Sequence, residues 1–470
     1  MKIQQKLSLC GAIIFGLLQS AYPIPYYVAT NGSDAVGTAG TSWDTAFLTI
    51  SNAVFKAQTN MLNSVVVSNG TYQLTAAYIS ITNGITVQAL STNAADTLVN
   101  GMGTYLCFRL SHTNAMLSGF TISNGYDTSL GGGIWFQKGT ITNCVIKNCT
   151  SSLGGGAYMY SGSTLTHCEI IYNLSTNTSG SGGGGVYLSE SNCTVASCRI
   201  AFNLAYDGGG VQVESGGTVT DCDIHDNIAT NYGGGLAVRG GNNLIVRNCT
   251  VSNNMARAQR GGGVSLNGSA GSTVLANSII CNNSAGRGGG VYVTGSYGEM
   301  RNCLLCHNVS PFGSYEGGGL YINNGYVENC TIVSNYATTA AGRGGVHNRG
   351  GGTPYSGGGK LRNTIVWYNV GQVASNYYDD AGGGTCTNCF VAPTNSYGAN
   401  NSSADPLFVD KDTGNFRLQG SSPCINAGVN QEWMNNAVDL DGHKRLDYFK
   451  LIVDVGAYEF LPRGTMLTTY

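Results

Sequence analysis

Residues 207–238 read DGGGVQVESGGTVTDCDIHDNIATNYGGGLAV, and this stretch decides the fold. It holds one complete repeat, which runs from the glycine triplet at 208–210 to the next triplet at 233–235. Residues 211–213 (VQV) follow the triplet and alternate, which is typical of a β-strand with one buried face. Residues 222–227 (CDIHDN) form a second signature between the triplets.

Both signatures recur along the chain. The triplet begins every 23 to 29 residues, at Gly131, Gly154, Gly183, Gly208, Gly233, Gly261, Gly288 and Gly317. The second signature reads C-x-[ILV]-x-x-N, and we expect Gly119 to replace its cysteine in an early coil, which would place Asn124 in the asparagine column. A coil of about 25 residues cannot bury its own apolar face, so it must stack on its neighbours. The repeats therefore predict an all-β solenoid of about ten parallel coils, with strands ~4.8 Å apart.

The asparagine that ends each signature predicts a structural ladder. Asparagine tolerates the left-handed turn conformation, and its amide can donate to and accept from the next asparagine of a column. The predicted ladder contains Asn173, Asn203, Asn227, Asn254, Asn283, Asn308 and Asn335. The cysteine of each signature shares the inward face, where we expect free, buried thiols. Cys281 and Cys306 are expected to face outward on successive coils.

The composition and the N-terminus limit the partners and the location. Only 10% of the residues are charged and the net charge is −2, so no basic field exists to attract nucleic acid. Lys2 and Lys6 precede an apolar run at 7–18, which predicts a signal peptide over residues 1–21 and a secreted or cell-surface protein. No later apolar stretch is long enough for a transmembrane span.

Three blocks of sequence resemble bacterial β-helix proteins. The N-terminal block is 27–34 (YVATNGSD) with 40–43 (GTSW), followed by an expected amphipathic helix near residues 50–58. The C-terminal block includes 405–408 (DPLF) and 453–460 (VDVGAYEF). With the repeat array between them, these blocks resemble the pectate-lyase-like right-handed β-helix superfamily, especially bacterial surface proteins related to the polymorphic outer-membrane proteins.

This resemblance implies a right-handed parallel β-helix with a helix cap at its N-terminal end. The expected parts are a signal peptide (1–21), an N-terminal cap with the first β-helix coils (22–100), glycine-rich β-helix repeats (101–390) and a C-terminal capping module (391–470). The fold hosts lyases, hydrolases, adhesins and inert spacers, so it does not decide the activity.

One outward column of the predicted strands carries aromatic residues that suit sugar rings. They are Trp135, Tyr158, Tyr187, Tyr292 and Tyr321. The flat rings predict a ligand-binding surface for polysaccharide or a cell-surface glycan. The alternative is structural, because aromatic cross-strand pairs also stabilise sheets.

Charged residues offer two candidate sites for chemistry. Asp223 and His225 should face outward with Arg199 one coil away, which would be the catalytic set of an enzyme. The residue before each triplet forms a second charged column, which contains Asp207, Tyr232, Arg260, Arg287, Glu316 and Arg343. The sequence does not firmly imply any cofactor. Ca²⁺ is the candidate ion, because Asp410 with Asp412 and Asp439 with Asp441 resemble fragments of calcium loops in the C-terminal module, although neither pair completes the EF-hand spacing.

Two functions are consistent with these patterns. The first is an exported, non-catalytic adhesion or glycan-binding module, because no converging acid–base set is evident in the sequence. The second is a polysaccharide lyase or hydrolase that acts on uronic-acid-containing polymers, which the resemblance implies.

Overall fold

The computed structural model describes residues 25–462 except for short gaps. The gaps are 60–63, 241–242, 268–270, 296–297, 313–316, 350–356, 381–382, 394–397 and 447–450. The predicted signal peptide (1–21) and Glu316 lie outside the described residues.

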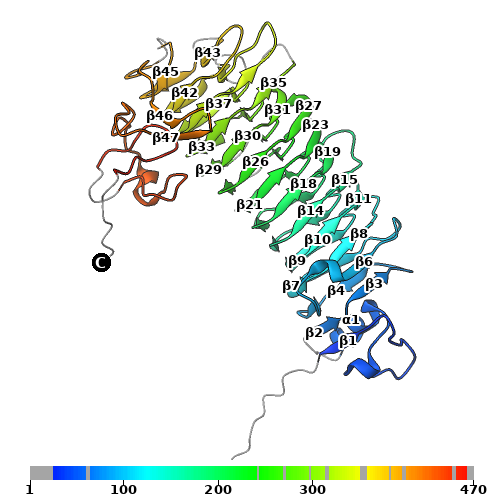
Figure 1. Cartoon of the computed structure of the whole chain (residues 1–470). Coiled ribbons are helices and arrows are strands. Elements are labelled where there is room, and N and C mark those ends of the chain that lie inside the picture. The colour runs from blue at the N-terminus through cyan, green and yellow to red at the C-terminus, as the bar shows by residue number, and fades with distance from the viewer. Residues whose placement is uncertain are drawn as a thin grey trace, which may run out of the picture.

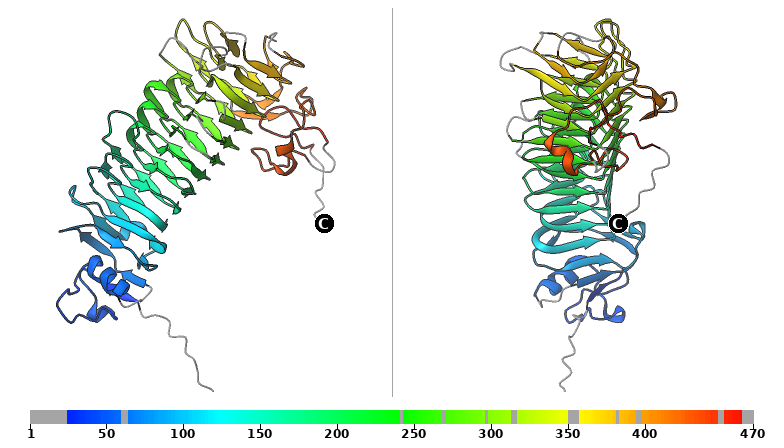
Figure 2. Two further views of the ribbon diagram at one scale, coloured as in Figure 1. Left: turned by 180° about the vertical axis from the view of Figure 1, so that it is seen from behind. Right: turned by 90° about the vertical axis from the view of Figure 1, so that its left-hand side faces the viewer.

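The protein is a right-handed parallel β-helix that forms a curved rod, with its C-terminal segment packed beside the last coils (Figures 1 and 2). Each typical coil contributes two strands to a first face, one strand to a second and one to a third, which we call faces A, B and C. Within residues 101–389, the described part of face B contains ten strands, which agrees with the number of coils that the signatures predict.

The strands of each face follow in chain order. Face A consists of β1 (Tyr26–Val28), β2 (Ser64–Val67), β4 (Ile79–Ile81), β5 (Thr86–Ala89), β7 (Phe108–Ser118), β9 (Ile134–Thr142), β12 (Ala157–Met159), β13 (Ser163–Thr166), β16 (Val186–Leu188), β17 (Thr194–Ala196), β20 (Val211–Val213), β21 (Gly217–Thr220), β24 (Leu236–Val238), β25 (Leu244–Arg247), β28 (Val264–Asn267), β29 (Thr273–Ala276), β32 (Val291–Thr294), β33 (Gly298–Arg301), β36 (Leu320–Ile322), β37 (Asn324–Glu328), β40 (Val346–Asn348), β41 (Gly358–Arg362), β43 (Tyr377–Asp379) and β44 (Thr385–Thr387). Face B consists of β3 (Gly70–Gln73), β6 (Thr97–Asn100), β8 (Thr121–Ser123), β10 (Val145–Lys147), β14 (Glu169–Ile171), β18 (Arg199–Ala201), β22 (Asp223–His225), β26 (Thr250–Ser252), β30 (Ile279–Cys281), β34 (Leu304–Cys306), β38 (Thr331–Val333), β42 (Ile365–Trp367) and β45 (Phe390–Val391). Face C consists of β11 (Thr150–Ser151), β15 (Leu174–Ser175), β19 (Leu204–Asp207), β23 (Ile228–Tyr232), β27 (Met255–Arg260), β31 (Ser284–Arg287), β35 (Val309–Ser310) and β39 (Tyr336–Ala337).

A short helix covers the N-terminal end of the rod. Helix α1 (Ile50–Thr59) buries Ile50, Ala53, Val54 and Ala57 against the first strands, which confirms the predicted amphipathic helix. Within the described residues, the other helices are short 3₁₀ segments, η1 (Trp43–Thr45), η2 (Ala94–Asp96) and η3 (Glu432–Asn436).

The predicted asparagine column is a continuous hydrogen-bonded ladder between faces B and C. Asn227 donates its Nδ2 to Oδ1 of Asn254 at 3.0 Å and to the carbonyl of Ile200 at 2.8 Å. Its Oδ1 accepts from both Nδ2 and the backbone N–H of Asn203. The same bonds join Asn173, Asn203, Asn227, Asn254, Asn283, Asn308, Asn335 and Asn369. Each amide in the interior of this ladder is thus buried with its hydrogen bonds satisfied.

The left-handed turn residue is one position before the ladder asparagine, which corrects the sequence-based expectation. Asp226 has φ 54° and precedes Asn227. The predicted alignment of the early coil is also wrong by one residue, because Phe120, not Gly119, aligns with Cys144. Asn124 is therefore an exposed turn residue with φ 51° and does not belong to the ladder.

The cysteines of the signature line the core as free thiols. Cys168, Cys198, Cys222 and Cys249 are each at most 3% exposed, and none of the described cysteines forms a disulfide. Cys281 and Cys306 do lie on the outer side of face B in adjacent register. Cys306 is nevertheless buried, because the C-terminal segment packs over it.

The glycine triplets are required by close approach between coils. Gly208 has φ +60°, a backbone angle that residues with a side chain rarely adopt. A Cβ on Gly209 would lie 2.4 Å from the carbonyl oxygen of Gly234 on the next coil. Side chains at these positions would force the coils apart.

The C-terminal module packs on the outer surface of face B. Its hairpin of β46 (Phe408–Asp410) and β47 (Asn415–Leu418) places Phe408 and Phe416 in one apolar cluster with outward residues of β34, β38 and β42. Inside the module, Arg445 donates to Glu459 at 2.8 Å, and both side chains are fully buried.

We predict that Asn227→Leu destabilises the rod by about 1–3 kcal/mol, because it leaves buried hydrogen-bonding groups of both neighbouring coils unpaired. Chemical denaturation would measure this loss. The matched control is Thr230→Leu at an exposed position of the same coil, which should change stability by about 0.5 kcal/mol or less. Equal losses in both variants would contradict a stabilising ladder.

Candidate functional site

The outward residues of the glycine-triplet strands form one column along face A. In chain order, this face A column contains Arg109, Trp135, Tyr158, Tyr187, Gln212, Ala237, Ser265, Tyr292, Tyr321, His347 and Tyr378. Most of these side chains are buried although they point away from the core. In the middle of the column, Gln212, Ala237 and Ser265 interrupt the aromatic residues.

Asp207 lies beside this interruption, at the end of β19. Its Oδ1 accepts a hydrogen bond from the backbone N–H of Tyr232 at 3.1 Å. Its Oδ2 is 3.8 Å from Nε of Arg239 and has no hydrogen-bond partner among the described residues. The carboxyl is 1% exposed, and this burial raises its pKa to about 6, against the opposing effects of the Tyr232 amide and Arg239.

Gln212 is a second buried polar residue with unpaired side-chain atoms. Its side chain is fully buried, and neither Oε1 nor Nε2 forms a hydrogen bond within the described part of the chain. An unpaired buried amide costs about 1–3 kcal/mol, so a protein retains one only where something else compensates.

A polar bridge crosses face A at this level. Nη1 of Arg239 donates to Oγ of Ser181 at 3.2 Å, and Ser181 Oγ lies 3.2 Å from Oε2 of Glu214. Because Arg239 follows β24 and Ser181 precedes β16, this bridge spans the width of the strands over the coil of Gln212. The Arg239 side chain is 41% exposed, so it can move without breaking the core. We call Ser181, Asp207, Gln212, Glu214 and Arg239 the Asp207 site.

A second arginine lies further along the same surface. Nη1 of Arg260 donates to the hydroxyl of Tyr232 at 3.1 Å, and its guanidinium is 5.1 Å from the ring centre of Tyr292. Its Nε is buried and has no partner among the described residues. The region therefore combines two arginines, a carboxyl that titrates near neutral pH, and an unpaired amide. Such groups could bind hydroxyls and carboxylates, and Asp207 could carry a proton.

The five predicted aromatic residues lie in the face A column, but their rings mostly contact each other. Tyr158 and Tyr187 stack at 5.3 Å with planes 9° apart, and Tyr292 and Tyr321 stack at 5.1 Å. All four tyrosines are at most 8% exposed. Trp135 is half-buried, with the Arg109 guanidinium 4.0 Å from its ring centre. The burial favours the structural alternative, and sugar binding by these rings stays a prediction.

The hydroxyl of Tyr187 contacts the Asp207 site. The hydroxyl lies 3.4 Å from Oε2 of Glu214. Burial, together with the negative charge of Glu214, raises the pKa of Tyr187 to about 12. The phenol is therefore protonated at neutral pH and can donate a hydrogen bond.

The predicted catalytic set Arg199, Asp223 and His225 lies on the outer side of face B. Arg199 and Asp223 are in adjacent register as predicted, but Arg199 pairs with Glu169. His225 Nδ1 is 2.7 Å from Asp226, and its Nε2 is 3.8 Å from Asp223. Asp223 is well exposed, so this set offers less electrostatic preorganisation than the Asp207 site. Its catalytic role stays a prediction.

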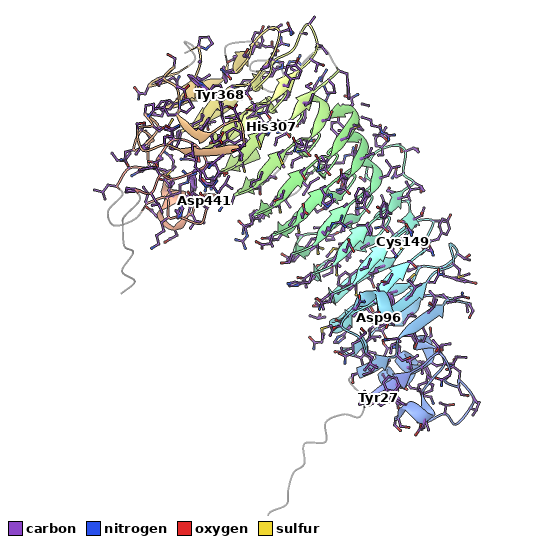
Figure 3. The ribbon with its side chains drawn as sticks, viewed as in Figure 1. Tyr27, Asp96, Cys149, His307, Tyr368 and Asp441 are labelled. Atoms are coloured by element: carbon purple, nitrogen blue, oxygen red, sulfur yellow. The ribbon has the colours of Figure 1, made fainter. Side chains whose placement is uncertain are left out.

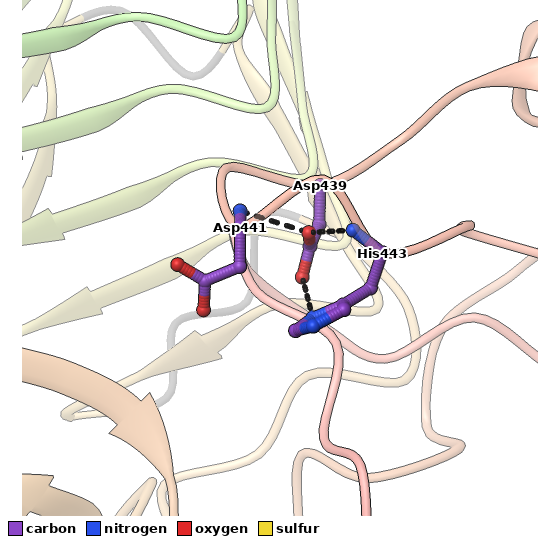
Figure 4. A group of neighbouring side chains, drawn as sticks. All are labelled: Asp439, Asp441 and His443. Atoms are coloured by element: carbon purple, nitrogen blue, oxygen red, sulfur yellow. Dashed lines mark hydrogen bonds and ion pairs between the residues drawn. The ribbon is translucent and has the colours of Figure 1, made fainter. Parts of the chain in front are cut away.

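The predicted calcium ligands Asp439 and Asp441 do not fit a calcium site. Oδ1 of Asp439 accepts from the backbone N–H of Asp441 and His443 (Figure 4). Its Oδ2 accepts from the backbone N–H of Glu459. Both oxygens of Asp441 accept from Arg417. The carboxylates that would hold Ca²⁺ are thus already engaged, and an imidazole is not a ligand that Ca²⁺ prefers. Asp439 stabilises a turn of the C-terminal module.

Sequence reasoning found only part of the Asp207 site. Asp207, Tyr232 and Arg260 were recognisable as the column before the glycine triplets. Gln212 occupied a known outward position, where a polar residue replaces aromatic ones. Arg239 and Ser181 carried no periodic signal, because they contact each other across coils.

Comparison with known families agrees with the architecture. The sequence matches the family described as right handed beta helix region over residues 83–229 and 208–366, which together cover more than half of the chain. The chain belongs to the right-handed β-helix family. The relation to polymorphic outer-membrane proteins is not part of this match.

The comparison with solved structures finds similar chains at low sequence identity. Pectate lyase Pel9A is 16% identical over 92% of this chain and 96% of its own, with a TM-score of 0.39. The PL6 family alginate lyase AlyGC is 15% identical over 87% of this chain and 58% of its own, with a TM-score of 0.42. XylC, in complex with xylose, is 11% identical over 93% of this chain and 98% of its own, with a TM-score of 0.44. These likenesses carry no argument about activity.

Two further comparisons gave negative results. No curated protein matches this β-helix sequence. Among the described residues, no helix is long and apolar enough to cross a membrane.

We predict that Asp207 makes the stability of this β-helix fall as the pH rises from about 4 to about 6. Its folded pKa of about 6 exceeds the unfolded value of about 3.9, so the native state binds more protons in this window. Asp207→Asn should remove this contribution, which amounts to at most about 3 kcal/mol. Urea denaturation of both proteins at pH 4 and pH 7 would measure it. A constant difference between the two proteins at both pH values would contradict the raised pKa.

Proposed function

We propose that this protein is an exported glycan-binding rod that holds an acidic polysaccharide at the Asp207 site on face A. The observation that carries the proposal is the buried carboxamide of Gln212, whose two polar atoms have no partner among the described residues. A bound glycan would supply the missing hydrogen bonds, because a hydroxyl both donates and accepts.

The charges beside Gln212 favour a uronic-acid polymer over a neutral one. Arg239 and Arg260 present guanidinium groups, which bind carboxylates in a fork geometry. Asp207, when protonated, can donate to an acidic sugar where an ionised carboxylate would repel it. Long polymers also suit a site on the side of a rod, because the ligand can extend along successive coils.

A lyase or hydrolase is the second candidate, and Asp207 is the observation that favours it. A carboxyl with a pKa of about 6 can exchange a proton near neutral pH, as general acid–base catalysis requires. The Tyr187 hydroxyl and Arg239 lie on the same bridge and could stabilise developing negative charge. The binding function needs no such step and is the simpler proposal.

Export rests on the N-terminal pattern of Lys2, Lys6 and the apolar run at 7–18. We expect the mature protein, expressed with its leader in a bacterium, to begin after residue 21 and to reach the secreted or cell-surface fraction. Intact-mass measurement of the purified protein tests this, and retention of the leader in the cytoplasm would contradict it.

We predict that Arg239→Ala weakens binding of oligogalacturonate or oligoalginate by about 10- to 100-fold, because it removes a charge-assisted hydrogen bond of about 1.5–3 kcal/mol. Calorimetric titration would measure the affinity. Arg247→Ala is the matched control, because Arg247 is an exposed arginine on face A in the next strand of the same coil.

Three outcomes distinguish the candidates. Loss of binding in Arg239→Ala alone would support the proposal. Equal binding by both variants, or no binding of any uronate polymer by the wild type, would contradict it. A rise in ultraviolet absorbance on incubation with a uronate polymer would show unsaturated product and establish lyase activity, which Asp207→Asn should then abolish.

A further inference from the structure

On two neighbouring coils, the turn between faces B and C carries an aromatic residue in a conformation that aromatic residues rarely adopt. Tyr172 has φ 57° and Phe202 has φ 58°, which is the left-handed region. The equivalent residues of neighbouring coils are Asn124, Asn148, Asp226, Asn253, Asn282, His307, Ser334 and Tyr368. Short polar residues are the ones that tolerate this conformation, so the two rings are held there against the local preference of the backbone.

These two rings form an exposed stack. Their centres are 4.9 Å apart and their planes are 9° apart. Tyr172 is 55% exposed and Phe202 is 39% exposed, in contrast to the buried tyrosines of the face A column. On the next coil, the imidazole of His225 meets the Phe202 ring edge-on at 5.7 Å. The stack is therefore closed at its Phe202 end, and the free face of Tyr172 is directed toward the preceding coil.

The preceding coils carry an uncharged groove of about 460 Å³. It is lined by Asn100, Met102, Gly103, Asn124, Gly125, Tyr126, Asn148 and Thr150. Asn148 precedes Tyr172 by one coil, so the groove ends where the free ring face begins. Asn124 donates its amide to Asn100 at 3.2 Å, which orders the polar side of the groove. Tyr126 is 39% exposed and Met102 is 51% exposed.

At the other end of the rod, the same turn column contacts the C-terminal module, and Figure 3 labels two of its residues there, His307 and Tyr368. The ring centre of His307 lies 6.1 Å from that of Phe416, and the ring centre of Tyr368 lies 6.3 Å from that of Phe408. Rings in this turn column thus contact other aromatic side chains where the C-terminal module supplies them. Tyr172 and Phe202 keep their exposure in the described structure.

We propose that the groove at residues 100–150, together with the Tyr172–Phe202 stack, binds a neutral oligosaccharide. Flat aromatic rings offer apolar area to the C–H groups of a sugar ring, and asparagine amides pair with its hydroxyls. No charged side chain lines the groove, so an acidic or basic ligand would lose hydration there without a counter-charge. At the Phe202 end of the stack, the Arg199 guanidinium is 5.8 Å from the ring centre and is already paired with Glu169. This site lies between faces B and C and is independent of the acidic-glycan site proposed on face A.

The test uses residues that the protein itself carries at the same turn position. Tyr172→Asn and Phe202→Asp copy the residues of the flanking coils, Asn148 and Asp226. The probes are hexasaccharides of cellulose, xylan, mannan and amylose, titrated against the full chain by calorimetry or nuclear magnetic resonance. We expect at least one probe to bind the wild type, and each variant to bind it at least 10-fold more weakly.

Thermal unfolding separates this role from a structural one. If the rings serve binding, Tyr172→Asn should leave the unfolding midpoint unchanged or raise it, because asparagine suits φ 57° better than tyrosine. Asn148→Gly provides a second variant, since glycine adopts positive φ freely and removes only the amide that faces the groove. It should weaken the same probe without lowering the midpoint.

Several results would overturn the proposal. They are the absence of binding for all four probes, unchanged affinity in both Tyr172→Asn and Asn148→Gly, and a lowered midpoint in Tyr172→Asn, which would make the rings a structural stack. Arg239→Ala should retain neutral-glycan binding, so failure of the acidic-glycan proposal would leave this one intact.

Discussion

The asparagine ladder fixes how every coil lies on the next. Each ladder amide uses its oxygen for the preceding coil and its nitrogen for the next asparagine and for a carbonyl, so a coil can neither slide nor rotate without unpairing buried groups. The ladder lies directly after a left-handed turn residue, so the direction of the chain is set at the same point. Equivalent residues of different coils are thereby held in columns about 4.8 Å apart.

Once columns are fixed, a site in this protein arises by substitution within a column. On face A, Gln212 replaces an aromatic residue between two stacked tyrosine pairs, and the adjacent column places Asp207, Tyr232 and Arg260 side by side. Near Gln212, the side chain of Arg239 at the margin of the strands reaches Ser181, which lies two coils away. The site residues therefore depart from the repeat, while the neighbouring coils keep the repeat and hold these residues in place.

The fold could be predicted from the sequence because its constraints are periodic. The glycine triplets, inward cysteines and ladder asparagines all repeat, and each has one physical reason to do so. The prediction was wrong where a coil lacks the full signature: Phe120 takes the inward position, so Asn124 falls one place early and lies in the turn. The repeat also could not predict which outward side chains are exposed, because an outward residue such as Tyr321 is buried when its neighbours stack on it. The contact between Arg239 and Ser181 joins residues 58 positions apart in sequence, and no period relates them.

The turn column between faces B and C shows how one scaffold can present different surfaces along its length. Near the N-terminus the column carries asparagines, then two exposed rings, then Asp226 and further asparagines. Near the C-terminus, the rings of His307 and Tyr368, which Figure 3 labels, contact Phe416 and Phe408 of the C-terminal module. The side chain of the turn residue points away from the core and contributes little to it, whereas the asparagine that follows forms the buried ladder. Substitutions there are limited mainly by the left-handed backbone, so the column can change its chemistry from coil to coil while the register of the rod stays the same.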